Sequence, residues 1–126
     1  MLVNLHVKNF AIIDEIDVDF SSGLNILTGE TGAGKSILIG SIGIALGARV
    51  SQEIIGKHGN SAMVEIVFQI EDEETKEKLS RLDVDPDEGQ IVISRRITGS
   101  RSVNRINGEN VSVSVIRQVA ALCIDI

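Results

Sequence analysis

Gly29-Glu30-Thr31-Gly32-Ala33-Gly34-Lys35-Ser36 is the stretch of this 126-residue chain that decides the fold. It fits the pattern G-x-x-x-x-G-K-[ST] of a phosphate-binding loop. The apolar run at residues 24–28 predicts a strand before the loop, and the apolar segment at residues 36–47 predicts a helix after it. This order, which such a loop requires, favours a phosphate-binding loop over a glycine-rich turn that matches by chance.

Each residue type in the loop has a chemical purpose. Gly29, Gly32 and Gly34 let the backbone take conformations in which successive N–H groups turn inward around a phosphate. The start of the following helix adds its positive dipole end. Lys35 would reach the β- and γ-phosphates, and the Ser36 hydroxyl would complete the coordination shell of Mg²⁺. We therefore expect a nucleotide-binding α/β domain.

Length and composition indicate one domain with a moderate core, since 43% of the residues are hydrophobic. Apolar runs stay below the roughly 18 residues of a membrane span, and no basic region of a secretion signal precedes the first apolar residues. We therefore expect no membrane partner. Cys123 is the single cysteine and stands in an apolar stretch, which favours a buried structural thiol over a nucleophile and predicts a reducing, cytoplasmic location.

The net charge of −6 argues against a broad surface that grips nucleic-acid phosphates. Any contact with DNA must then be local. His6 and His58 have no further ligand at metal-binding spacing, so we interpret both as ordinary strand or loop residues and expect no zinc site.

The first part of the chain alternates between apolar and polar residues. Residues 2–10 and 12–20 predict two antiparallel strands with one wet face, and residues 62–70 predict a long strand. In the second strand Ile16, Val18 and Phe20 should face the core, with Glu15, Asp17 and Asp19 facing solvent.

The second part predicts helices and a hairpin. The charged run at residues 71–78 is typical of a solvated helix face, and residues 83–89 form the clearest loop. Residues 91–97 and 102–106 predict a hairpin with its turn at 98–101. Asn107-Gly108 predicts a second tight turn, Ser112 a cap for a helix running through Leu122, and residues 123–126 the start of another strand. The expected architecture is a mixed α/β sandwich, in which an antiparallel sheet packs against a parallel core around the loop.

Hydrolysis of a nucleotide would need a second acidic element at the end of a strand. The one candidate is Asp125, which stands inside a short apolar run without a glutamate after it. We therefore favour a strand residue over a catalytic aspartate, and no complete catalytic set is expected in this chain.

From end to end the chain resembles the RecN family, DNA repair proteins of the SMC-like branch of ABC-type ATPases. The loop sequence GETGAGKS is similar to the loop sequences of that family, whereas chromosome SMC proteins have GxNGSGKS at this place. The resemblance rests on residues 9–13, on residues 27–37, on Leu46-Gly47-Ala48-Arg49 and on residues 102–108.

The resemblance implies a P-loop NTPase head of ABC/SMC type, with residues 1–126 as its N-terminal lobe. A coiled-coil arm would separate this lobe from a C-terminal half that supplies the remaining catalytic elements, so the chain is expected to be a fragment that is inactive alone. ATP would be sandwiched with Mg²⁺ between two heads of a homodimer, and the whole protein would act on DNA in double-strand-break repair and recombination, in association with the nucleoid. The implied ligands are Gly29, Glu30, Thr31, Gly32, Ala33, Gly34, Lys35, Ser36, Ile37 and Arg49 for the nucleotide, with Ser36 also on the metal.

Two interpretations remain open for each of the following residues or groups of residues. Arg49 matches a position near the nucleotide, where an arginine can reach phosphates or sense DNA, but a solvated surface arginine fits equally well. Phe10 is a possible neighbour of adenine, although a core position is favoured. A cluster on the predicted hairpin either forms a local basic strip or, as we favour, a solvated strand face: Arg95, Arg96, Arg101 and Arg105.

Other functions are compatible with parts of the pattern. A non-catalytic scaffold that binds nucleotide to stabilise its fold is one, although the intact Lys35 and Ser36 count against it. The head of another SMC-like chromosome protein is a second. A small kinase is the least favoured, because neither an acceptor base nor a lid segment is recognisable.

Overall fold

Among the residues that the structure describes, six strands pair into one antiparallel sheet in the order β2-β1-β3-β4-β5-β6. The computed structural model describes residues 2–10, 13–20, 40, 42–48, 54–57, 59–99 and 101–124. The strands are β1 (Leu2–Phe10), β2 (Ile13–Asp19), β3 (Ser61–Gln69), β4 (Gln90–Thr98), β5 (Arg101–Ile106) and β6 (Glu109–Asn110), and the helices are α2 (Glu73–Ser80) and α3 (Val113–Ile124).

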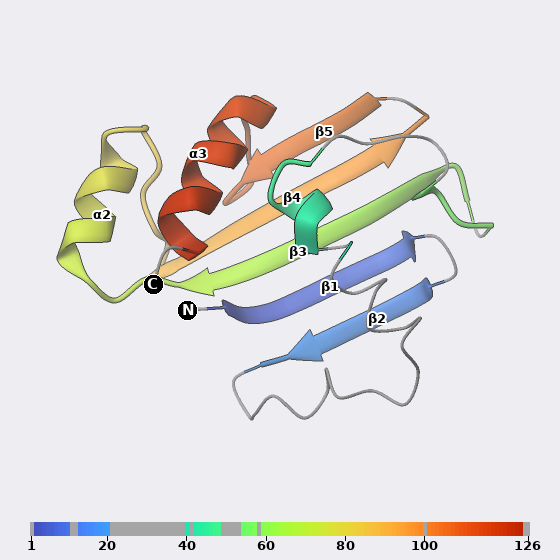
Figure 1. Cartoon of the computed structure of the whole chain (residues 1–126), viewed down its shortest axis with the longest axis horizontal. Coiled ribbons are helices and arrows are strands. Elements are labelled where there is room, and N and C mark those ends of the chain that lie inside the picture. Colours follow the sequence, from blue (N-terminus) through green and yellow to red (C-terminus); the bar gives the residue numbers. More distant parts are fainter. Residues whose placement is uncertain are drawn as a thin grey trace.

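The helical elements gather on one side of this sheet, as Figure 1 shows. Helix α3 and the helical residues 42–45 lie over the sheet face, and α2 packs beside α3 near one end of the sheet. The sheet residues that point to this side are apolar because each strand alternates with period two. The inner row of β3 is fully or almost fully buried and consists of Ala62, Val64, Ile66 and Phe68.

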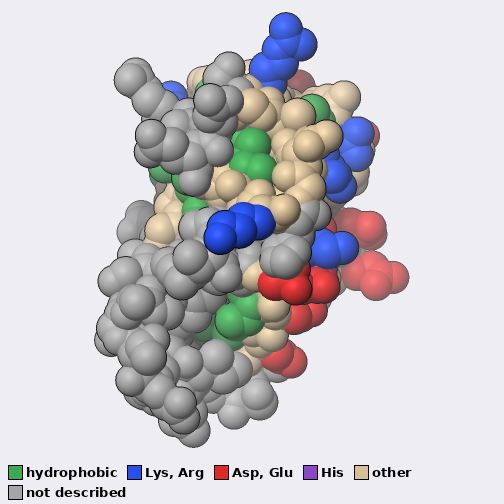
Figure 2. Space-filling view, turned by 90° about the vertical axis from the view of Figure 1, so that its right-hand side faces the viewer, with side chains coloured by type: hydrophobic (Ala, Val, Ile, Leu, Met, Phe, Trp, Pro, Cys, Tyr) green, Lys and Arg blue, Asp and Glu red, His purple; other side chains and the backbone are tan. Residues whose placement is uncertain are grey.

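The opposite face of the sheet carries polar side chains that are sorted by charge. On β2 the acidic residues Glu15, Asp17 and Asp19 are exposed, whereas β4 and β5 expose arginines. Figure 2 shows the molecule from one end of the sheet, with the Asp and Glu side chains at the right of the view and Lys and Arg side chains at the top and at mid-height. We call the polar face of the sheet the outer face.

The alternation predicted for residues 12–20 is confirmed. Val18 and Phe20 are buried, Ile16 is half-buried, and the three acidic residues between them are exposed. The strand itself runs from Ile13 to Asp19. On the outer face His6 Nε2 lies 2.7 Å from Glu15 Oε2, in the paired strands β1 and β2.

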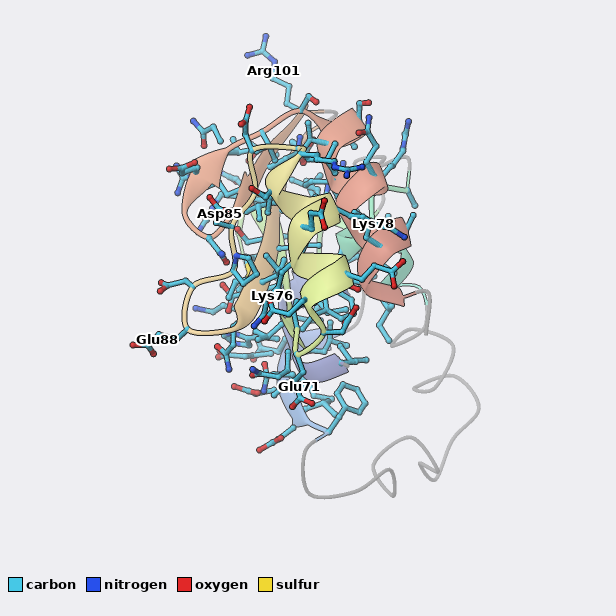
Figure 3. All side chains as sticks on the ribbon, turned by 90° about the vertical axis from the view of Figure 1, so that its left-hand side faces the viewer. Glu71, Lys76, Lys78, Asp85, Glu88 and Arg101 are labelled. Carbon is cyan, nitrogen blue, oxygen red and sulfur yellow. The ribbon has the colours of Figure 1, made fainter. Side chains whose placement is uncertain are left out.

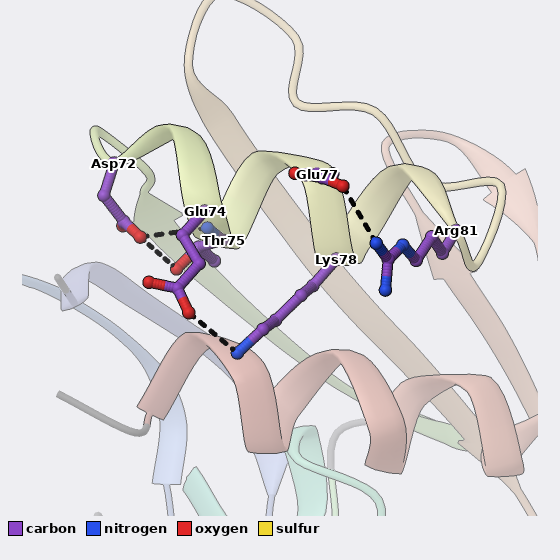
Figure 4. Close-up of polar contacts among 6 residues, drawn as sticks. All are labelled: Asp72, Glu74, Thr75, Glu77, Lys78 and Arg81. Atoms are coloured by element: carbon purple, nitrogen blue, oxygen red, sulfur yellow. Dashed lines mark hydrogen bonds and ion pairs between the residues drawn. The ribbon is translucent and has the colours of Figure 1, made fainter.

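Helix α2 is the predicted charged helix, and it starts two residues later than the charged run (Figure 4). Asp72 is its N-cap and accepts a hydrogen bond from the Thr75 backbone N–H at 2.9 Å. Ion pairs one turn apart, Lys78 to Glu74 at 3.4 Å and Arg81 to Glu77 at 2.9 Å, line its exposed side. Within α2 only Leu79 is buried, so the helix face is solvated as expected.

Helix α3 begins as predicted but ends later. Ser112 caps it, because the Val115 N–H donates to Ser112 Oγ at 3.2 Å. The strand predicted at residues 123–126 is wrong for its first two residues, because α3 continues to Ile124. Residues spaced by three and four form one buried stripe that ends at Cys123, so packing favours another helical turn. The stripe is Ile116, Val119, Ala120 and Cys123.

The predicted hairpin and second turn are also confirmed. Thr98 pairs with Arg101 across the first turn, and Arg101 projects outward from it (Figure 3). Asn107 and Gly108 form the second turn with positive φ angles of 49° and 86°, and this turn leads into β6, which the sequence did not predict. The predicted strand at residues 24–28 and Asp125 lie outside the described residues.

Burial confirms the structural interpretation of two further residues. Phe10 is 6% exposed and belongs to the core. Cys123 is buried as a free thiol, and burial raises its pKa to about 11, so the unreactive protonated form prevails at neutral pH.

The N-cap of α2 should make stability depend on pH in the acid range. The hydrogen bonds that Asp72 accepts from the Thr75 side chain and backbone lower the pKa of its carboxyl below the ordinary value of 3.8. A lowered pKa in the folded state adds stability that is present above pH 3.8 and is lost as the pH falls through the folded-state pKa. We expect wild type to exceed Asp72→Ser in unfolding free energy at neutral pH, because the carboxylate also faces the helix dipole. Urea unfolding at several pH values should show this difference shrinking in acid, and a constant difference would contradict the assignment.

Candidate nucleotide-binding site

The residues predicted to hold the nucleotide, residues 29–37 and Arg49, lie outside the part of the chain that the structure describes. Their roles therefore stay predictions. The structure describes what surrounds them in the chain: the helical segment that follows the predicted loop, residues 42–48, and the strands that this segment contacts.

The segment at residues 42–48 ends its helix in a Schellman motif. The Ala48 N–H donates to the Gly43 carbonyl at 3.1 Å, and the Gly47 N–H donates to the Ile44 carbonyl at 3.1 Å. Gly47 has a φ of +107°, a left-handed conformation that favours glycine. A Cβ at this position would also lie 2.6 Å from Arg117 Cγ of α3. The chain therefore turns sharply at Gly47, two residues before Arg49 in the sequence.

Two guanidinium groups bind the carbonyls at this helix end. Arg95 Nη1 donates to the Ile44 carbonyl at 2.7 Å and to the Ala48 carbonyl at 2.8 Å. Arg117 Nε donates to the Gly47 carbonyl at 3.0 Å. The last carbonyls of a helix carry its negative dipole end, so both cations stand where the helix favours positive charge.

Arg95 is buried, with 2% of its surface exposed, and this corrects the expectation of a solvated strand face. Arg96, Arg101 and Arg105 are exposed as expected, but Arg95 points to the inner face of the sheet. Burial lowers the pKa of Arg95, and the nearby positive charge of Arg117 lowers it further. A signal was present in the sequence, because Arg95 stands in phase with the buried isoleucines of β4 at positions 91, 93 and 97.

Asn9, near the end of β1, forms hydrogen bonds with the chain that leads into β3. Asn9 is buried and has a positive φ of 51°, which asparagine tolerates better than most residues. Its side chain donates to the Ser61 carbonyl at 2.9 Å, and its own carbonyl accepts from the Gly56 N–H at 2.8 Å. Asn9, which belongs to the RecN-like pattern, thus contacts the chain at both Gly56 and Ser61, and its neighbour Phe10 forms a β-bridge with Ile55.

One hollow in the surface of the described residues does not suit a nucleotide. Three aspartates and Glu109 line it, and carboxylates at this density repel phosphates. Glu88 of the adjoining loop points outward into solvent (Figure 3). Within the described residues, no group of three or more His, Cys, Asp or Glu side chains is placed to hold a metal ion. Neither α2 nor α3, nor any other helical stretch that the structure describes, has the length and apolar character of a membrane span.

Comparison with known proteins identifies the relatives of this chain. A family model described as "AAA domain" matches residues 4–122. The DNA repair protein RecN of Halalkalibacterium halodurans is 41% identical over 100% of this chain, and that of Bacillus subtilis is 40% identical over 100%. The chain spans 23% and 22% of the length of these two relatives.

Solved structures share the fold. A structure from work on ATP-driven dimerization and DNA-stimulated activation of SMC ATPases matches with a TM-score of 0.74 and 25% identity, over 98% of this chain and 79% of that chain. An Smc head bound to the C-winged helix domain of ScpA matches with a TM-score of 0.75 and 22% identity, over 98% of this chain and 41% of that chain. The expected fold class is therefore confirmed: an α/β domain of the SMC-head type with an antiparallel sheet.

Gly47→Ala should destabilise the domain more than an alanine at a comparable open turn. A Cβ in left-handed backbone costs about 1–2 kcal/mol, and its contact with Arg117 Cγ should add about 1–3 kcal/mol. Gly108→Ala is the matched control, because Gly108 also has a positive φ, of 86°, but has open space around it. The measurement is the free energy of unfolding in urea. Equal losses in the two variants would show that the contact between Gly47 and Arg117 does not matter.

Proposed function

The chain belongs to the AAA domain family, and on that premise we propose that it is the ATP-binding N-terminal half of a RecN-like ATPase head in DNA double-strand-break repair and recombination. The observation that carries the proposal is the loop at residues 29–36, which stands in a chain 41% and 40% identical to two RecN proteins. The SMC-head fold of the described residues supports it.

The proposed nucleotide site consists of residues 29–37 together with Arg49. The donor set fits a triphosphate with Mg²⁺. Glycine N–H groups would donate hydrogen bonds to the phosphate oxygens, and the Lys35 ammonium would offset their negative charge. The Ser36 hydroxyl is a hard oxygen ligand of the kind that Mg²⁺ prefers. Arg49 directly follows Ala48, whose carbonyl Arg95 holds, so a fixed segment would deliver the Arg49 side chain. Bound Mg²⁺ would supply charge neutralisation at the β- and γ-phosphates.

We assign residues 1–126 to the N-terminal lobe of the head. Turnover of ATP would need the C-terminal half, which would carry the acidic strand that activates water. The proposed partners are that half, the second head of a homodimer and DNA, in a cytoplasmic, nucleoid-associated protein. The net charge of −6 requires any DNA contact made by this chain itself to be local.

Two alternatives fit less well. A non-catalytic scaffold would not need Lys35 and Ser36, both of which are intact. The head of another SMC-like chromosome protein would have GxNGSGKS in the loop, where this chain has GETGAGKS.

Calorimetric titration with Mg·ATP tests the proposal. We expect the wild-type chain to bind, and Lys35→Ala to weaken binding at least tenfold because the phosphates lose their cation. Lys76→Ala, which removes a lysine from the charged face of α2, is the control and should bind like wild type.

Phosphate release in the same samples tests whether ATP turnover needs the C-terminal half. We expect no turnover by the chain alone. Turnover would mean that the chain is a complete enzyme. Binding that does not depend on Lys35 would support the scaffold, and no binding would overturn the proposed function.

A further inference from the structure

Arg95 connects two parts of the molecule that are far apart in the sequence. Its Nη1 reaches the carbonyls of Ile44 and Ala48 in the segment that follows the predicted phosphate loop. The same guanidinium is anchored on β5, where Nε donates to Asn104 Oδ1 at 2.8 Å and Nη2 donates to Ser102 Oγ at 3.3 Å. One side chain therefore spans the gap between the sheet and the helix end.

The positive charge of Arg95 is buried at this contact. The described residues include no carboxylate within salt-bridge distance of Arg95, and Arg117 nearby is a second cation. Burying a charge is unfavourable unless it is well hydrogen-bonded. The acceptors that compensate it are neutral oxygens, two of them at the negative end of a helix. The hydrogen bonds to the Ile44 and Ala48 carbonyls therefore compensate the cost of burying the Arg95 charge at this helix end.

We propose that Arg95 is a positioning residue for the nucleotide site. Its guanidinium fixes the end of the helix that follows the phosphate loop against the β4–β5 hairpin, and it fixes the backbone that carries Arg49. This inference rests on the proposed function of the loop. A helix moves as a stiff unit, so a displacement at residues 44–48 is transmitted to the loop at the other end of the predicted helix.

Arginine is suited to this role in a way that lysine is not. Its planar fork holds five N–H donors in fixed directions, and here it serves four acceptors at once. An ammonium has three donors on one atom and could not span acceptors on both sides of the gap. We therefore expect Arg95→Lys to restore little of what Arg95→Gln loses.

Hydrogen exchange tests the contact without nucleotide. In Arg95→Gln we expect the amides of Leu46, Gly47 and Ala48 to exchange at least tenfold faster than in wild type, with β3 unchanged. Arg96→Gln is the matched control, because Arg96 is the exposed neighbour on the outer face. Exchange that is the same in both variants, or that rises equally in β3, would overturn the inference.

Affinity for Mg·ATP tests the effect on the site, at a temperature where circular dichroism shows every variant to be folded. We expect the Kd to rise at least fivefold in Arg95→Gln and to stay at the wild-type value in Arg96→Gln. An unchanged Kd in Arg95→Gln beside a wild type that binds through Lys35 overturns this inference alone. A wild-type chain that binds no nucleotide overturns the proposed function and this inference with it.

A milder variant covers the case in which Arg95→Gln does not fold. Asn104→Ala keeps the guanidinium and removes its Nε acceptor, while the Asn104 backbone contact with Val111 stays. We expect the same local rise in exchange and a Kd change of about twofold or more. Wild-type values for both in folded Asn104→Ala would overturn the inference.

Discussion

The pairing of β3 with β4 is the constraint on which the rest of the structure depends. Nine residue pairs run from Ser61 opposite Thr98 to Gln69 opposite Gln90 without a shift in register. A slip by one residue would turn every side chain of β4 to the other face, so the isoleucines of its inner row would be exposed. Burial of those isoleucines therefore determines the register, and the register determines that Arg95 points into the core.

A buried cation at this place is consistent with how the helix ends. The Schellman motif at Gly47 uses the carbonyls of Gly43 and Ile44. The carbonyls of Gly47 and Ala48 follow, and they accept hydrogen bonds from Arg117 and Arg95. Arg95 also donates to the Ile44 carbonyl, which therefore accepts two hydrogen bonds. The glycine turn and the two guanidinium groups thus form one unit that terminates the helix and joins it to both the sheet and α3.

The sequence predicted most of the elements that the structure describes, because local rules and burial agree in them. Alternation located the long strands, Asn107-Gly108 located a turn, and Ser112 located the start of α3. The two errors have a common cause. The end of α3 and the burial of Arg95 are decided by packing between distant segments, and only the spacing relative to apolar neighbours hinted at either. The loop at residues 29–36 was recognisable from sequence as a nucleotide site, and its ligands stay predictions because they lie outside the described residues.

The acidic row on β2 has a consequence for the behaviour of the molecule in solution. Among the described strands β2 is an edge of the sheet, and an edge offers unpaired backbone groups to a strand of another molecule. Glu15, Asp17 and Asp19 are exposed along it, so two copies that approach edge to edge bring like charges together. This repulsion opposes strand addition between copies of the chain. Salt would weaken this repulsion by screening.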